Sequence, residues 1–306
     1  MSKTAVRDPS TGAIVKATPK DGGWGNIGIY FIALCIISVC LAPVLYIVLG
    51  GFRTSSQITT SPAGFPNPFV PGNYWTALTI NPTTVKIGPI SANVSAFWAM
   101  FINSAYIAII TVFFVVLFGV MASFVLARYK FRLRNAMYLL FASGLMFPLS
   151  VAITPLYIMM TRTHLAGSPW SVILPQVAFG LPQTIIILTP FLAAIPMEIE
   201  EAATVDGCTR LGFFWRMVVP LSMPGVITVA ILNFVGSWNS YMLPLYMFSD
   251  QSQYTLPLGV QMFSTAHSAD TAQIMAFTSL SMIPALVFFL MFEKRIVGGL
   301  TGAVKG

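Results

Sequence analysis

The sequence contains little charge. Of its 306 residues only 8% are Asp, Glu, Lys or Arg, whereas 56% are hydrophobic and the mean hydropathy is +0.81. Soluble domains contain about 25% charged residues, so a soluble fold of this length would lack polar surface. The composition therefore predicts an integral membrane protein whose main solvent is lipid.

Groups that catalyse reactions or bind metals are also scarce. The cysteines, Cys35, Cys40 and Cys208, form neither a disulfide framework nor a zinc pattern, and His164 and His267 have no ligand spacing around them. No G-x-x-x-x-G-K-[ST] loop is present to bind ATP, and the G-x-G-x-x-G match at residues 23–28 lacks the strand and acidic residue of a dinucleotide site. We therefore predict that this chain is not an enzyme and itself binds no metal or cofactor.

Long segments without charge map the predicted membrane spans. A spanning helix needs about 20 mostly apolar residues and satisfies its backbone hydrogen bonds internally. We therefore predict an all-α protein with six transmembrane helices, at residues 27–51, 97–127, 136–160, 171–194, 224–248 and 272–292. Prolines and polar residues exclude most of residues 52–96, which we interpret as a large external loop.

The positions of Lys and Arg predict the orientation. Most of the 16 basic residues fall near the N-terminus, after the second and sixth spans, and between the fourth and fifth spans. Because cytoplasmic loops carry an excess of Lys and Arg, both termini are predicted to lie in the cytoplasm. The same distribution explains the net charge of +7 without a nucleic acid partner. Residues 1–26 are then a polar cytoplasmic tail, and residues 27–306 are the membrane domain.

The loop at residues 195–223 differs from the other cytoplasmic loops, because its local signals predict two short helices around a sharp turn. Pro196 suits a first helical position, Gly207 a left-handed stop, and Thr209 a cap for the second helix. Pro220 and Pro224 then interrupt the chain before the fifth span. The second helix is marked by apolar residues at helical spacing, Leu211, Phe214, Trp215 and Val218.

Acidic residues gather in this loop. Four of the nine acids of the chain lie here: Glu198, Glu200, Glu201 and Asp206. They neighbour Ala202 and Ala203, whose small side chains let another backbone approach, and acids pair with basic groups on a partner. A solvated amphipathic loop with acids matched to the helix dipole explains the same residues, so physics alone leaves both interpretations open.

The pattern Glu201-Ala202-Ala203-x-x-Asp206-Gly207, with prolines at 220 and 224, resembles the EAA loop of ABC importer permeases. The resemblance implies a type I ABC importer permease fold, in which these five residues dock on a cytoplasmic ABC ATPase dimer. It also implies that ATP and magnesium bind to the ATPase and not to this chain. Cys208 departs from the family pattern, which usually has alanine at this position.

Four further segments resemble the carbohydrate branch of these permeases, the maltose-transport type: residues 72–74, 127–132, 236–239 and 299–306. The resemblance is to the smaller, second permease of a heterodimer. It implies an importer of sugars, with oligosaccharides as the expected substrates, in a bacterial or archaeal cell membrane. The implied partners are a homologous second permease, the ATPase dimer and an extracellular solute-binding protein.

A path for a neutral sugar is expected to be lined by uncharged polar and aromatic groups. The candidates are Asn103, Ser104, Asn233, Ser237, Trp238, Asn239 and Tyr241. Hydrogen bonding between helices is an alternative explanation of the same residues. By its position in the family, the external loop at residues 249–270 is expected to reach the binding protein, with candidate contacts at Gln251, Ser252 and Gln253.

Other classes of membrane protein stay open at this stage. A secondary carrier driven by an ion gradient usually needs membrane-buried charges, and no Asp, Glu or Arg lies within the six predicted spans. An ABC permease for peptides or amino acids is disfavoured only by the resemblance to the carbohydrate branch. A structural membrane scaffold has no positive feature in the sequence.

Overall fold

The computed structural model describes residues 25–80, 82–87, 90–264 and 269–304, together with two short paired strands, β1 (Val6–Arg7) and β2 (Ile14–Val15). Most of the predicted N-terminal tail lies outside the described residues, as does His267. The chain divides into two compact units, Met1–Ile47 and Val48–Gly306, and each is described separately.

The first long helix is α1 (Gly25–Gly50), which contains Pro43. It covers nearly all of the first predicted span, and its segment Gly28–Gly50 is long and apolar enough to cross a membrane. Prolines are tolerated in membrane helices because neighbouring groups can satisfy the freed backbone carbonyl.

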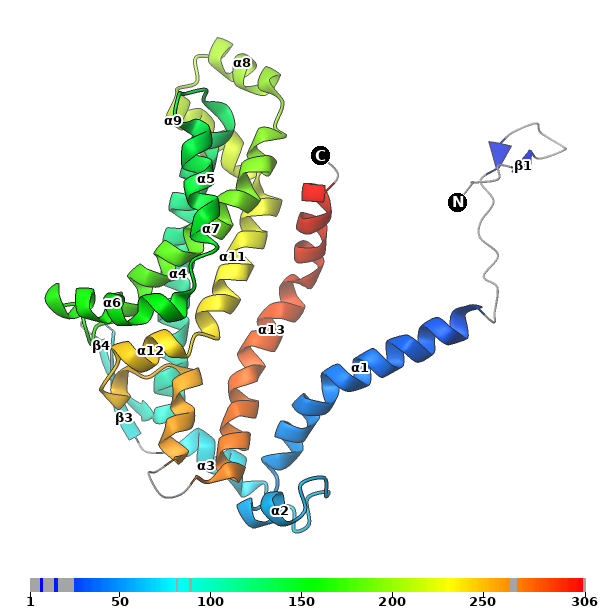
Figure 1. Ribbon diagram of the computed structural model, residues 1–306, viewed down its shortest axis with the longest axis vertical. Coiled ribbons are helices and arrows are strands. Elements are labelled where there is room, and N and C mark those ends of the chain that lie inside the picture. The colour runs from blue at the N-terminus through cyan, green and yellow to red at the C-terminus, as the bar shows by residue number, and fades with distance from the viewer. Residues whose placement is uncertain are drawn as a thin grey trace. The chain divides into compact units, whose positions relative to one another are not determined.

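Four long helices, α4 (Ala96–Arg128), α7 (Trp170–Ala193), α11 (Met223–Trp238) and α13 (Thr271–Val304), dominate the second unit (Figure 1). Helix α4 packs on α7 and α11, and α11 also packs on α13. At a rise of about 1.5 Å per residue, α4 is about 50 Å long and exceeds the thickness of a membrane core. Helices α1, α4, α7 and α13 are long and apolar enough to cross a membrane, as the predicted spans at these positions require.

The third predicted span is not one straight helix. Helices α5 (Arg134–Gly144) and α6 (Leu149–Arg162) meet at a bend of 97°. Pro148 precedes α6 with extended backbone, and a proline cannot continue the hydrogen-bond ladder of α5. Gly144 also packs closely on α7, since an added Cβ would lie 2.9 Å from Cγ of Pro182.

The fifth predicted span is shorter than expected. Helix α11 ends at Trp238, and the short helix α12 (Met242–Met247) follows it. Helical residues Arg210–Leu221 precede α11 at a bend of 75°. Among the described residues, four helices can cross a membrane, or up to six if each bent pair forms one span.

The segment between α1 and α4 is more structured than a plain loop and is not all helical. It contains α2 (Ser55–Thr60), α3 (Gly72–Thr79) and an antiparallel hairpin of β3 (Pro82–Ile87) and β4 (Ile90–Ser95). The strands contain β-branched residues such as Thr83, Thr84 and Val94, which favour extended backbone. The prediction of an all-α chain is therefore wrong for this segment.

Arg53 organises the same segment. It is 2% exposed, and its guanidinium donates to the carbonyl oxygens of Pro62 at 2.9 Å, Gln57 at 2.8 Å and Ser61. The amide of Asn73 donates to the carbonyl oxygen of Arg53 at 2.8 Å. Arg53 therefore caps backbone carbonyls of the segment that follows α1.

Candidate functional site

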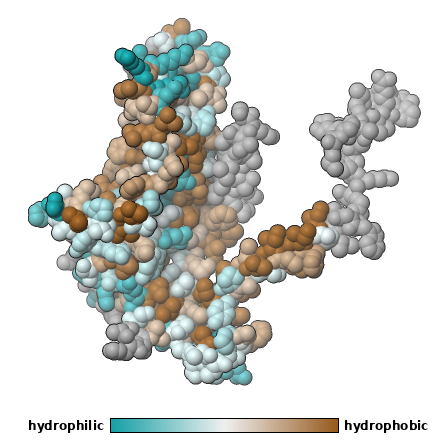
Figure 2. All heavy atoms as spheres, in the orientation of Figure 1, coloured by the Kyte–Doolittle hydropathy of each residue, from teal (hydrophilic) through white to brown (hydrophobic). Residues whose placement is uncertain are grey.

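The candidate site begins with a short helix, α8 (Met197–Val205), at one end of the second unit (Figure 1). Hydrophilic residues gather at this end, and hydrophobic residues are prominent over the long helices (Figure 2). Pro196 directly precedes the helix as its N-cap, one position earlier than predicted. Glu198 and Glu200 lie in the first turn, where carboxylates interact favourably with the helix dipole.

Gly207 ends α8 in the predicted left-handed conformation, with φ +76. Its N–H donates to the carbonyl oxygen of Thr204 at 3.0 Å, and the N–H of Cys208 donates to that of Ala203 at 2.9 Å. These two bonds form a Schellman motif, which satisfies the last carbonyls of the helix. The sharp turn predicted from the glycine is confirmed.

A second helical segment follows the turn. Thr209 caps α9 (Arg210–Phe213), because its Oγ1 accepts from the N–H of Gly212 at 3.1 Å. A π-helical turn, η1 (Phe214–Val218), and α10 (Val219–Leu221) continue to Ser222, where the chain bends into α11. Pro220 lies in the first turn of α10 and Pro224 in that of α11, so the predicted interruption before the fifth span is confirmed.

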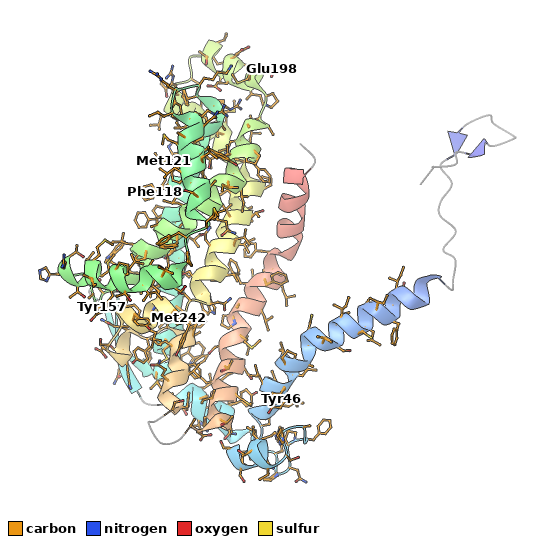
Figure 3. All side chains as sticks on the ribbon, in the orientation of Figure 1. Tyr46, Phe118, Met121, Tyr157, Glu198 and Met242 are labelled. Carbon is orange, nitrogen blue, oxygen red and sulfur yellow. The ribbon has the colours of Figure 1, made fainter. Side chains whose placement is uncertain are left out.

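The two sides of α8 have different surroundings. Ala203 is 4% exposed and packs in an apolar cluster with residues of α4, α7, η1 and α11. Glu201 and Ala202 are exposed, and Val205 is 87% exposed. Glu198, also exposed, is labelled at this end of the molecule (Figure 3). The small side chain of Ala203 therefore packs inside this chain, whereas Glu198, Glu201 and Ala202 lie on the exposed face of α8.

The predicted apolar face of the second helix is only partly buried. Phe214 and Val218 are buried, whereas Leu211 is 68% exposed and Trp215 is 50% exposed. An apolar groove of about 520 Å³ lies beside them, lined by Met121, Phe124, Val125, Tyr129, Arg210, Leu211, Phe214 and Trp215. The loop thus presents both acidic and apolar groups at its surface.

A buried cation, which was not among the predicted site residues, contacts α8. The side chain of Arg128, the last residue of α4, is 4% exposed, and its Nε lies 4.0 Å from Oε2 of Glu200. Its Nη1 donates to Sδ of Met197 at 3.1 Å. Nothing in the spacing of positions 128 and 200 could have identified this pair, because the contact depends on how α4 meets α8.

At the other end of α4 from Arg128, candidates for the sugar path contact the loop that contains the candidate binding-protein contacts. The amide of Asn103 donates to the carbonyl oxygens of Ser252 at 2.8 Å and Tyr254 at 3.1 Å. Oγ of Ser104 accepts from the N–H of Leu256 at 2.9 Å. Helix α4 therefore holds the predicted binding-protein loop, whose Gln251, Ser252 and Gln253 form the 3-10 helix η2 (Gln251–Gln253). A polar pocket of about 270 Å³ lies at this junction, lined by Asn103, Tyr106, Ile107, Pro169, Phe248, Asp250, Ser252 and Gln253.

Two other candidates for the sugar path bond between helices. The amide of Asn233 on α11 donates to Oγ1 of Thr184 on α7 at 3.0 Å. Oγ of Ser237 donates to Oε1 of Gln176 at 2.6 Å, and Oγ1 of Thr111 on α4 donates to the same oxygen at 3.1 Å. Gln176 was not among the predicted site residues, although a glutamine within an uncharged apolar span indicates a hydrogen bond between helices.

The last part of the predicted path contains one buried residue, Trp238, and two exposed ones, Asn239 and Tyr241. Trp238 is 3% exposed and packs against Phe101 and Phe234, with ring centroids 5.6 Å away in each case. Asn239, which follows α11, is exposed. Trp238 therefore behaves as a core residue, and Asn239 and Tyr241 are the more accessible candidates.

The described part of the chain contains no group of three or more His, Cys, Asp or Glu side chains placed to bind a metal ion. Cys35, Cys40 and Cys208 are free thiols. His164 lies in a turn with φ 56 after α6.

Comparisons with known proteins agree with this architecture. Residues 115–297 match the family described as "Binding-protein-dependent transport system inner membrane component". The trehalose transport system permease protein SugB of Mycobacterium tuberculosis is 38% identical over 216 residues, which cover 69% of this chain and 78% of that protein. The sulfoquinovosyl glycerol transport system permease protein SmoH of Agrobacterium fabrum is 31% identical over 279 residues, covering 90% of this chain and 93% of that protein.

A solved structure shares the fold. The crystal structure of a bacterial ABC transporter involved in the import of the acidic polysaccharide alginate matches with a TM-score of 0.72 at 17% identity, covering 90% of this chain and 98% of that chain. The family match extends over α7, the loop with its Schellman turn, and α11. This chain therefore belongs to the family of binding-protein-dependent transport system inner membrane components.

Proposed function

We propose that this chain is one of two homologous membrane-spanning subunits of an ATP-driven sugar importer. Membership of a binding-protein-dependent transport family supports the transport role. The relatives named for trehalose and for sulfoquinovosyl glycerol support a sugar-derived substrate, and their different substrates restrict the proposal to a class of compounds. The proposed partners are a second permease, a cytoplasmic ABC ATPase dimer that binds ATP and magnesium, and an extracellular solute-binding protein.

The proposed topology has six spans with both termini in the cytoplasm of a bacterial or archaeal cell. It counts the α5–α6 pair as one span and α11, with the bend before it, as another. The excess of Lys and Arg near the predicted cytoplasmic ends supports this orientation. In this topology α8 faces the cytoplasm, and the segment containing α2, α3 and the β3–β4 hairpin faces the outside.

The outward display of acids on α8 is the observation that carries the coupling role. Glu201, Ala202 and Asp206 are exposed around a turn fixed by Gly207, while Ala203 anchors the helix to the bundle. A helix held on one side and acidic on the other suits docking into a basic groove of another protein. We propose that the ATPase docks on this surface and that Ala203 contributes by holding α8 in place.

The polar candidates divide between two proposed roles. Asn103, Asn233, Ser237 and Trp238 are engaged in contacts within the chain, so they shape the path and hold the external loop. Asn239 and Tyr241 are exposed and stay candidates for direct sugar contact. We propose that Gln251, Ser252 and Gln253, held by Asn103, meet the binding protein.

Affinity purification of the tagged chain in mild detergent tests this proposal. We expect a phosphate-loop ATPase and a second homologous permease to co-purify, and Glu201→Lys to lower the yield of the ATPase by reversing the charge of the docking surface. Arg132→Leu, which removes an exposed charge outside the loop, is the matched control. Recovery of the wild-type chain alone, under conditions that keep other membrane complexes together, would favour a secondary carrier and contradict the proposal.

A further inference from the structure

The loop at residues 195–223, called the coupling loop from here on, packs against α4, α7 and α11. The chain connects it directly to α7 and α11 but not to α4. Helix α7 leads into α8 through Ala194, Ile195 and Pro196, and the second helical segment leads into α11. Helix α4 belongs to the same apolar cluster, but its chain continues from Arg128 toward α5. A movement of α8 therefore reaches α4 only through side-chain contacts.

Arg128 on α4 and Glu200 on α8 form an ion pair among these contacts. The Arg128 side chain is 4% exposed and that of Glu200 is 31% exposed, so water screens this pair less than an exposed one. Arg128 stands at the C-terminal end of α4 and Glu200 in the first turn of α8, where each charge suits the local helix dipole. The guanidinium also holds Sδ of Met197.

Nε of Arg128 and Oε2 of Glu200 are too far apart for a hydrogen bond in this structure. The distance of 4.0 Å between Nε and Oε2 exceeds the roughly 2.7–2.9 Å of a charge-assisted hydrogen bond. Nε and Nη2 of Arg128 and Oε2 of Glu200 are buried without a hydrogen-bond partner among the described residues. A shift of α8 toward α4 by about 1 Å would bring Nε–H and Oε2 into hydrogen-bond range.

We infer that Arg128 and Glu200 are positioning residues that join α8 to α4, so that a movement of the loop is delivered to the long helix as well as to α7 and α11. This inference rests on the proposed coupling role of the loop. Helix α4 holds the external 3-10 helix through Asn103, so the pair connects a contact at one end of the bundle to a contact at the other.

A distance measurement between α8 and α4 tests the inference directly. Spin labels replace Val205, which is 87% exposed on α8, and Met121, which is 47% exposed on α4. The native free cysteines are first replaced by serine. The complex that co-purifies with the tagged chain is measured without nucleotide and with ATP, and the yield of ATPase is recorded for each variant.

Arg128→Met removes the charge but keeps an unbranched chain, and Glu200→Gln keeps the shape and removes the charge. With native Arg128 and Glu200, we expect one narrow distribution of the distance between the two labels, both without nucleotide and with ATP. In either variant we expect this distribution to broaden with ATP, at an ATPase yield equal to that of the labelled chain with the native pair. Arg132→Met, the same change at an exposed position, is expected to keep the narrow distance. Glu200→Gln serves as the test if Arg128→Met does not fold.

Narrow distances in both variants with ATP would overturn the inference, because the two helices would then stay joined without the pair. If no ATPase co-purifies with the unmodified chain, the proposed function fails separately. The contact is internal to the chain, so the labels then compare the variants in the chain alone. A broader distance distribution in both variants than in the native chain supports the contact that holds α8 against α4. An equally narrow distribution refutes it.

Discussion

Substitution of Gly207 by alanine, which adds one methyl group, tests whether the turn after α8 is needed for the proposed coupling to the ATPase. The φ of Gly207 is +76, and no atom lies within 4 Å of an added Cβ, so Gly207→Ala introduces backbone strain without a steric clash. A left-handed alanine costs about 1–2 kcal/mol. Because about 1.4 kcal/mol changes an equilibrium constant tenfold, the fraction of loops with the native turn falls several-fold wherever the turn is marginal.

Gly207→Pro is expected to have a larger effect. Proline has no N–H, so the bond to the carbonyl oxygen of Thr204 at 3.0 Å is lost, which costs about 1 kcal/mol. Its ring also fixes φ near about −65°, which is incompatible with the observed turn. We expect Gly207→Ala to reduce and Gly207→Pro to abolish ATPase co-purification and ATP hydrolysis by the complex, while both variants insert into the membrane.

Gly167 supplies a matched control. It also has φ +76 and open space around an added Cβ, but it lies between α6 and α7, away from the loop. Gly167→Ala should therefore cost a similar free energy of unfolding and leave ATPase co-purification unchanged. Wild-type hydrolysis in Gly207→Pro would refute the reasoning, and so would an equal loss of co-purification in Gly167→Ala and Gly207→Ala.

Three further predictions follow from burial and hydrogen bonding. Ala203→Leu overpacks a side chain that is 4% exposed, costs about 1–3 kcal/mol and lowers the melting temperature in detergent, whereas Ala202→Leu at the surface leaves it unchanged. Trp238→Ala removes an indole that is 3% exposed, costs about 3–5 kcal/mol and lowers the melting temperature, whereas Asn239→Ala keeps that temperature and slows transport. Asn103→Ala removes two hydrogen bonds to the carbonyl oxygens of Ser252 and Tyr254, costs about 1–3 kcal/mol, and should speed protease cleavage near residues 251–254 at an unchanged ATPase yield.

Features set by local chemistry could be predicted from the sequence. A left-handed glycine, a threonine cap and two prolines within 29 residues specify the helix–turn–helix of residues 195–223 without any long-range contact. Four uncharged apolar segments likewise predict α1, α4, α7 and α13, because a spanning helix needs about 20 mostly apolar residues.

Features set by packing could not be predicted in the same way. Ala202 and Ala203 are identical in sequence terms, and only the direction in which α8 meets the bundle separates the exposed residue from the buried one. Trp238 is a candidate for the sugar path by residue type, and only its packing against Phe101 and Phe234 reveals that its side chain is buried. The 97° bend before Pro148 was hidden by an apolar run that satisfied the length of a span.

Polar side chains form hydrogen bonds between α4, α7 and α11. Oε1 of Gln176 on α7 accepts from Thr111 on α4 and from Ser237 on α11, so one side chain bonds to both neighbouring helices. Pulling one helix away would leave buried polar groups unpaired, at about 1–3 kcal/mol for each. The amide of Asn233 on α11 donates to Thr184 on α7, and the Arg128–Glu200 contact joins α4 to α8.

Aromatic rings form contacts of α13 with α11 and with α4. Phe234 on α11 stacks on Phe288 on α13 with ring centroids 4.0 Å apart, and Phe97 on α4 meets Phe277 on α13 edge to face at 5.6 Å. Apolar contacts of this type can slide without leaving a hydrogen-bonding group unpaired. We therefore expect movement of α13 along α11 to cost less than movement of α4 along α7. If the proposed coupling role of α8 holds, a displacement that starts there is expected to shift α4, α7 and α11 together against α13.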